Sequence, residues 1–118
     1  MPRLVAVEPF PRLARVLAGA GRTTDTFAGQ TRQGSVAGAT LTDQTFRAVR
    51  DTGGEAVVVG DDAAEPARDE LARHGLVLEL CAAASVAAAG LLRAAGRLAS
   101  GARIVAIGTA AAWLRPDF

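Results

Sequence analysis

The amino-acid sequence predicts an α/β fold: a small, mostly parallel sheet of about four strands flanked by helices. Short β-branched runs alternate along the chain with longer helical patterns. Strands that alternate with helices usually pair in parallel. The 118 residues, half of them hydrophobic, suit one small domain spanning residues 1–118, and no linker or repeat divides the chain.

Each element follows from its local pattern. Strand patterns cover residues 4–7, 56–59, 76–80 and 103–107. Helix patterns cover residues 11–18, the stretch from Thr42 or Asp43 to Gly53, the stretch from Asp61 or Asp62 to Arg73, and residues 82–99, with a short helical turn after the last strand. Pro66 favours a start for the third helix one or two residues later than its caps suggest. Residues 19–40, from Gly19 to Thr40, predict a long loop, which is either functional or poorly ordered.

Composition excludes several classes of function. Thirteen basic and twelve acidic residues leave a net charge of +1, without the basic excess of a nucleic-acid footprint. The longest apolar run, residues 82–92, is too short to span a membrane, and no secretory signal precedes it, so we expect a cytoplasmic protein. One Cys and one His cannot cage zinc. Every basic residue is Arg, so no internal lysine can form a Schiff base.

The predicted helix from Ala82 to Ala99 has an unusual surface. Its first three turns carry no polar side chain except Ser85. A helix that is apolar all round is normally covered on all sides, and a domain of this size has little material for that. We therefore expect this helix to be covered by a second copy of the chain or by a partner protein, although an Ala-rich surface helix is an alternative.

Four candidate residues or pairs are each better explained by structure than by chemistry. His74 precedes Gly75 at a predicted helix end, where it suits the helix dipole. The pair Asp61 and Asp62 suits a helix start, and Cys81 suits a small buried hydrophobic position. Pro2 would become a secondary amine, and so a possible catalytic base, if Met1 were removed, but many ordinary chains begin with Met-Pro.

The order of features resembles threonine synthases, which are fold type II (tryptophan synthase β-like) pyridoxal-phosphate-dependent enzymes. Residues 45–54 followed by the strand at 56–59 and Asp61 carry the resemblance in the middle of the chain. Residues 4–9, 67–76, 83–87, 104–109 and 114–117 are similar to further family segments in the same order. The resemblance covers nearly all 118 residues and corresponds to the C-terminal third of such an enzyme.

This resemblance implies a cofactor contact and also its limits. Thr109 lies where the family hydrogen-bonds the pyridine nitrogen of pyridoxal phosphate, so Thr109 is the implied cofactor-binding residue. The family's cofactor lysine and glycine-rich phosphate loop belong to segments upstream of those that this chain resembles. Leu80 stands where the family has Pro, and Ala110, Ala111 and Ala112 replace a glycine-containing turn, where a required positive φ would strain alanine.

Three hypotheses follow. In the first, the chain is a truncated threonine synthase-like domain that is not catalytic alone and acts as a self-associating or partner-binding module. In the second, it is the C-terminal portion of a split pyridoxal-phosphate-dependent lyase, completed by a chain that supplies the lysine and the phosphate loop. In the third, a small domain is reused for unrelated chemistry at residues 19–40 or at Pro2. No catalytic residue is assigned, and pyridoxal phosphate is expected only with a complementing chain.

Overall fold

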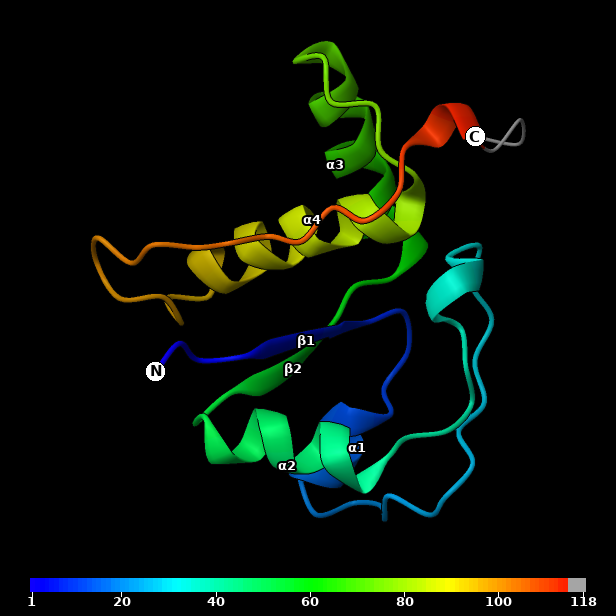
Figure 1. Ribbon diagram of the computed structural model, residues 1–118, viewed down its shortest axis with the longest axis vertical. Helices are drawn as coiled ribbons and strands as arrows, with labels where there is room; N and C mark the ends of the chain where they lie inside the picture. The colour runs from blue at the N-terminus through cyan, green and yellow to red at the C-terminus, as the bar shows by residue number, and fades with distance from the viewer. Residues whose placement is uncertain (115–118) are drawn as a thin grey trace. The chain divides into compact units, whose positions relative to one another are not determined.

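The computed structural model describes residues 1–114. The chain divides into two compact units, residues 1–60 and residues 61–118 (Figure 1). Compactness alone does not make either unit a separately folding domain, so one domain over residues 1–118 stays a prediction.

The first unit is a βαβ arrangement. In chain order its elements are β1 (Val5–Glu8), α1 (Leu13–Leu17), a 3₁₀ turn η1 (Gly34–Val36), α2 (Asp43–Asp51) and β2 (Glu55–Val58). The two strands pair in parallel, with Val5 opposite Glu55 and Glu8 opposite Val58. Both strands lie within one residue of the predicted ranges, and the parallel pairing confirms the α/β class. Gly54 is required before β2, because a Cβ there would lie 1.9 Å from the carbonyl oxygen of Leu4.

Helices α1 and α2 pack on the same side of the two strands (Figure 1). Helix α2 starts where the sequence predicts, since the Oγ1 of Thr42 accepts a hydrogen bond from the Thr45 amide at 3.1 Å. Val16 of α1 forms a buried cluster with Phe10 and Phe27, and Phe46 of α2 packs against this cluster.

The long loop over residues 19–40 is an ordered part of the first unit. Its Phe27 belongs to the buried cluster, and the Phe27 amide donates to the Ala39 carbonyl at 2.8 Å. Its Gln33 is completely buried and donates from Nε2 to the Val59 carbonyl at 2.8 Å. Buried anchors of this kind exclude the poorly ordered alternative for this loop.

The second unit is built from two packed helices, α3 (Asp61–Arg73) and α4 (Leu80–Ala94), followed by a 3₁₀ turn η2 (Ala112–Leu114). Helix α3 begins at Asp61 despite Pro66, so the later start expected from this proline is wrong. Pro66 removes one hydrogen bond near the helix start without ending the helix. The turn η2 is the helical turn predicted after residue 107.

The sheet has two strands in the described residues rather than about four. At residues 76–80 there is only an isolated antiparallel bridge, Leu78 to Ala111, because Leu80 already begins α4. Residues 103–107 are extended but belong to no strand. β-propensity favours an extended backbone, but a strand also needs a neighbour, and local sequence does not supply one.

Helix α4 runs over Leu80–Ala94 instead of residues 82–99. Gly96, at a φ of +67°, ends it: the Gly96 amide bonds to the Arg93 carbonyl and the Arg97 amide to the Leu92 carbonyl. This pair of bonds is a Schellman motif, which uses glycine because other residues are strained at positive φ. In the described residues all four α-helices end this way, at Gly19, Gly53, Gly75 and Gly96.

Candidate functional site

Thr109, the implied cofactor-binding residue, lies on an exposed, extended stretch between α4 and η2. Beyond it the chain is fixed against residues 77–79: the Glu79 amide donates to the Ala110 carbonyl at 3.0 Å, and the Ala112 amide donates to the Val77 carbonyl at 3.0 Å. Gly108 lies close to Leu78, whose Cδ1 would be 3.1 Å from a Cβ at that position. The structure therefore fixes the chain just after Thr109 and leaves Thr109 itself exposed.

The three alanines after Thr109 are not strained. Within residues 1–114, no residue other than glycine has a positive φ. Ala111 takes part in the bridge to Leu78 and Ala112 begins η2. The predicted strain at these alanines is wrong, because the chain follows an extended path here instead of the family's glycine-containing turn.

Among the described residues, the most buried charged side chain is one that sequence reasoning missed. Glu8, 3% exposed, ends β1 and receives three amide hydrogen bonds: Arg12 to Oε2 at 3.1 Å, Leu13 to Oε1 at 2.8 Å and Ala14 to Oε2 at 2.9 Å. These amides belong to the start of α1, where backbone donors have no partner inside the helix. The sequence signal that could have identified Glu8 is a carboxylate shortly before a predicted helix, where it can accept hydrogen bonds from the first amides of that helix.

Arg12 extends this arrangement to the long loop. Its Nε lies 3.5 Å from Glu8 Oε1, its guanidinium donates to the Gly38 carbonyl, and it stacks 5.2 Å from the centre of the Phe10 ring. Glu8 and Arg12 together hold α1 and the loop end near Gly38.

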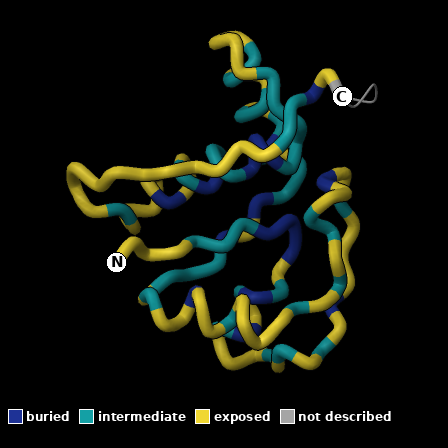
Figure 2. Tube along the Cα trace, viewed as in Figure 1, coloured by how far each residue is buried: buried dark blue, intermediate teal, exposed yellow. Residues whose placement is uncertain are grey.

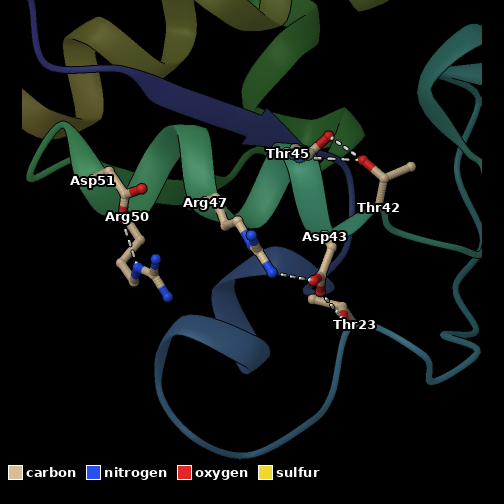
Figure 3. Close-up of polar contacts among 7 residues, drawn as sticks. All are labelled: Thr23, Thr42, Asp43, Thr45, Arg47, Arg50 and Asp51. Atoms are coloured by element: carbon tan, nitrogen blue, oxygen red, sulfur yellow. Dashed lines mark hydrogen bonds and ion pairs between the residues drawn. The ribbon is translucent and has the colours of Figure 1, made fainter.

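A second polar cluster lies on the surface of α2 (Figure 3). Thr23 donates to Asp43 Oδ1 at 2.7 Å, and Arg47 pairs with Asp43 Oδ2 at 3.1 Å. The Thr23 hydroxyl, followed by the Arg47 and Arg50 charges, holds the pKa of Asp43 below its ordinary value. These groups are exposed, and surface ion pairs of this kind contribute little to stability. Their role is to tie the loop at Thr23 to the first turn of α2.

The other candidates have structural surroundings. His74 follows α3 and its Nδ1 lies 2.9 Å from the Glu70 carbonyl, as expected for a helix end. Asp61 and Asp62 lie in the first turn of α3, and Asp62 accepts a hydrogen bond from the Ala63 amide. Cys81, in the first turn of α4, is only partly buried, contrary to the expectation of a small buried hydrophobic position. Pro2 is exposed.

No three His, Cys, Asp or Glu side chains of the described chain are grouped so as to hold a metal ion. Among residues 1–114, none of the helices combines the length and the apolar content that a membrane crossing requires.

The fold and the site together define an α/β protein in which an exposed threonine, Thr109, follows a stretch of β-favouring residues. Over residues 1–110 the sequence matches the family described as pyridoxal-phosphate dependent enzyme. The chain therefore belongs to the family of pyridoxal-phosphate-dependent enzymes. No match was found among curated proteins. Within the tail segment that resembles threonine synthases, residues 115–117 lie outside the described residues.

The residues present do not by themselves fit the family's cofactor. The chain has no lysine to bind pyridoxal phosphate covalently, and Thr109 is exposed on an extended stretch. A single exposed hydroxyl offers one hydrogen bond, whereas small-molecule sites enclose most of the ligand's surface. Membership of the family therefore predicts binding of pyridoxal phosphate, whereas the residues of this chain taken alone do not.

Proposed function

We propose that this chain is a threonine synthase-like member of the family that is not catalytic alone and acts as a module that associates with itself or with a partner protein. The observation that carries the proposal is the absence of lysine from all 118 residues, together with the exposure of Thr109. Chemistry that depends on a lysine-bound cofactor cannot run on a chain without lysine.

Apolar surface on the second unit supports association. Helix α4 buries Ala82, Ala83, Ala84, Ala88 and Leu92 within the chain. Leu91 on the same helix stays 43% exposed, and Gly90 is exposed beside it. The second unit exposes further large apolar side chains, among them Val105 and Ile107, and apolar surface of this kind favours a protein contact. Coverage of α4 by a second chain remains a prediction.

Light scattering on the purified chain, with and without pyridoxal phosphate, tests this proposal. We expect an oligomer whose mass does not change with the cofactor. The variant Ala87→Arg would place an unpaired charge in the contact and lower the mass to that of one chain. The matched variant Ala48→Arg, at an exposed position of α2 in the first unit, should leave the mass unchanged. A wild-type chain that is monomeric and binds no added protein would contradict the proposal.

A second candidate function is that of the C-terminal portion of a split pyridoxal-phosphate-dependent lyase. The family match through residue 110 and the exposure of Thr109 favour it. The test uses a second chain that carries a lysine and a phosphate loop, encoded next to this one. Cofactor should stay bound through gel filtration only when both chains are present. Thr109→Val should weaken that retention and Thr109→Ser should preserve it; retention that ignores Thr109 would exclude this role.

A further inference from the structure

Residues 103–109 form an extended stretch with an unpaired backbone, which we name the open segment. It is fixed at both ends, by the hydrogen bond from the Ala102 amide to the Ala99 carbonyl at 3.1 Å and by that from Glu79 to Ala110. Between these points, residues 103–109 make no hydrogen bond with any residue of the described chain. Figure 2 shows this part of the trace as continuously exposed.

The side chains of the open segment are typical of a β-strand that pairs with another strand and has its apolar side chains covered. Val105 is 89% exposed and Ile107 71%, although β-branched residues are the ones that strands bury. Alternate residues of an extended chain face opposite sides. Ile104, at 42%, is less exposed, and Gly108 lies against Leu78, so the odd-numbered positions face away from the unit.

The charge of the residues around the open segment indicates which kind of partner strand would bind to it. Residues 80–114 contain no aspartate or glutamate, whereas Arg93, Arg97 and Arg103 are all exposed. Arg103 is the one charged side chain of the open segment, so two open segments paired in parallel and in register would place two arginines opposite each other without a carboxylate between them. A strand that carries a carboxylate would instead complement Arg103, because oppositely charged cross-strand pairs are favourable and like charges are not.

We infer that the open segment is a docking edge for an extended, acidic segment of another polypeptide, which adds to it as a β-strand. Backbone groups of residues 103–109 supply the hydrogen bonds, apolar side chains of the partner cover Val105 and Ile107, and a partner carboxylate faces Arg103. This inference rests on the proposed function as a binding module and names the kind of partner and the place where it binds.

The test uses a peptide of sequence Glu-Thr-Val-Thr-Val-Thr-Glu and its counterpart with lysine in place of both glutamates. A charged residue at each end lets either strand direction place it opposite Arg103. Binding to the full chain is measured by fluorescence anisotropy, and amide hydrogen exchange by NMR. We expect the acidic peptide to bind at least about threefold tighter than the lysine peptide and to slow exchange within residues 103–109. Arg103→Glu should reverse the order of the two peptides.

Proline variants separate backbone pairing from nonspecific contact. Amides of neighbouring residues point to opposite edges of a strand, so either Val105→Pro or Ala106→Pro must weaken peptide binding, by about tenfold. Both positions are exposed and unpaired, so circular dichroism should report an unchanged fold. Ala106→Ser keeps the amide and should bind like the wild type.

Three results would overturn the inference: no binding of the acidic peptide, equal binding of both peptides, or full binding by both proline variants. Protection of residues 103–109 in the chain without peptide, in a dimer, would overturn it as well and would assign the segment to a second copy. If the chain associates while residues 103–109 stay unprotected by the acidic peptide, the inference fails and the proposed function stands.

Discussion

The Leu13 amide donates a 2.8 Å hydrogen bond to the buried carboxylate of Glu8, the last residue of β1. With the bonds from Arg12 and Ala14, this contact fixes the start of α1 directly to the end of the strand. Helix α1 has only five residues, far below the length at which an isolated helix is stable in water, so it depends on this anchor.

Glu8→Ala should therefore lower the free energy of unfolding by about 2–3 kcal/mol, since it leaves three amides at the start of α1 without their acceptor. Glu8→Gln keeps one oxygen acceptor and should cost about 1 kcal/mol. Urea unfolding followed by circular dichroism measures both. Asp69→Asn, which removes an exposed carboxylate, is the control and should stay within about 0.5 kcal/mol. Equal effects at Glu8 and Asp69 would show that Glu8 does not anchor α1.

Replacing Gln33 should lower the stability of the fold about as much as replacing Glu8. Replacing it with Leu keeps most of the side-chain volume but leaves the Val59 carbonyl without the Nε2 donor, at a cost of about 1–3 kcal/mol. Gln33→Leu is compared with Gln30→Leu, because Gln30 lies in the same loop and is exposed. Thermal melts should show a lower midpoint for the Gln33 variant alone; matching midpoints would mean that the loop does not depend on this bond.

Two glycines near the end of α4 should respond to alanine in opposite directions. Gly96 has a φ of +67°, so Gly96→Ala should destabilise by about 1 kcal/mol. Gly90 lies inside the helix, and a methyl group added there would meet no atom within 4 Å, so Gly90→Ala should stabilise by about 0.5–1 kcal/mol. Melting temperatures of the two variants test both signs, and a shared sign would contradict this account of the helix end.

Asp43 links stability to pH in a defined direction. Its folded pKa lies below the ordinary 3.8, chiefly through the Thr23 hydroxyl. A lowered carboxyl pKa contributes stability that is complete above the unfolded value and is lost as the pH falls through the folded value. NMR titration of the Asp43 carboxyl carbon should show the pKa rising toward 3.8 in Thr23→Val and unchanged in Thr24→Val. If the pKa of Asp43 is the same in Thr23→Val as in the wild type, the Thr23 hydroxyl does not lower that pKa.

Local patterns are sufficient to predict much of the fold. The apolar runs before Glu8 and after Gly54, and the cap at Thr42, are signals that neighbouring residues carry, and the structure has β1, β2 and the start of α2 accordingly. The end of α4 is predicted too late, because the helix-favouring composition of residues 91–99 masks the stop signal of Gly96. The two missing strands show a different limit, since pairing depends on a neighbour distant in sequence.

The candidate site is less predictable. Thr109 is singled out only through a family resemblance, and its cofactor role stays a prediction. Gln33 was missed because its partner, the Val59 carbonyl, comes near only after the chain folds back, whereas the partners of Glu8 are local and its signal was a carboxylate shortly before a predicted helix. Buried polar residues are recognised by the groups that they satisfy, which a single sequence does not display.

The register of β1 on β2 also sets an order of events during folding. Val5 pairs with Glu55, far along the chain, so the two strands cannot meet before that whole stretch is available. Contacts with such a large sequence separation slow folding, whereas each glycine-terminated helix closes through local bonds. On the ribosome, β1 therefore emerges before β2 and stays without its partner strand until β2 has been synthesised.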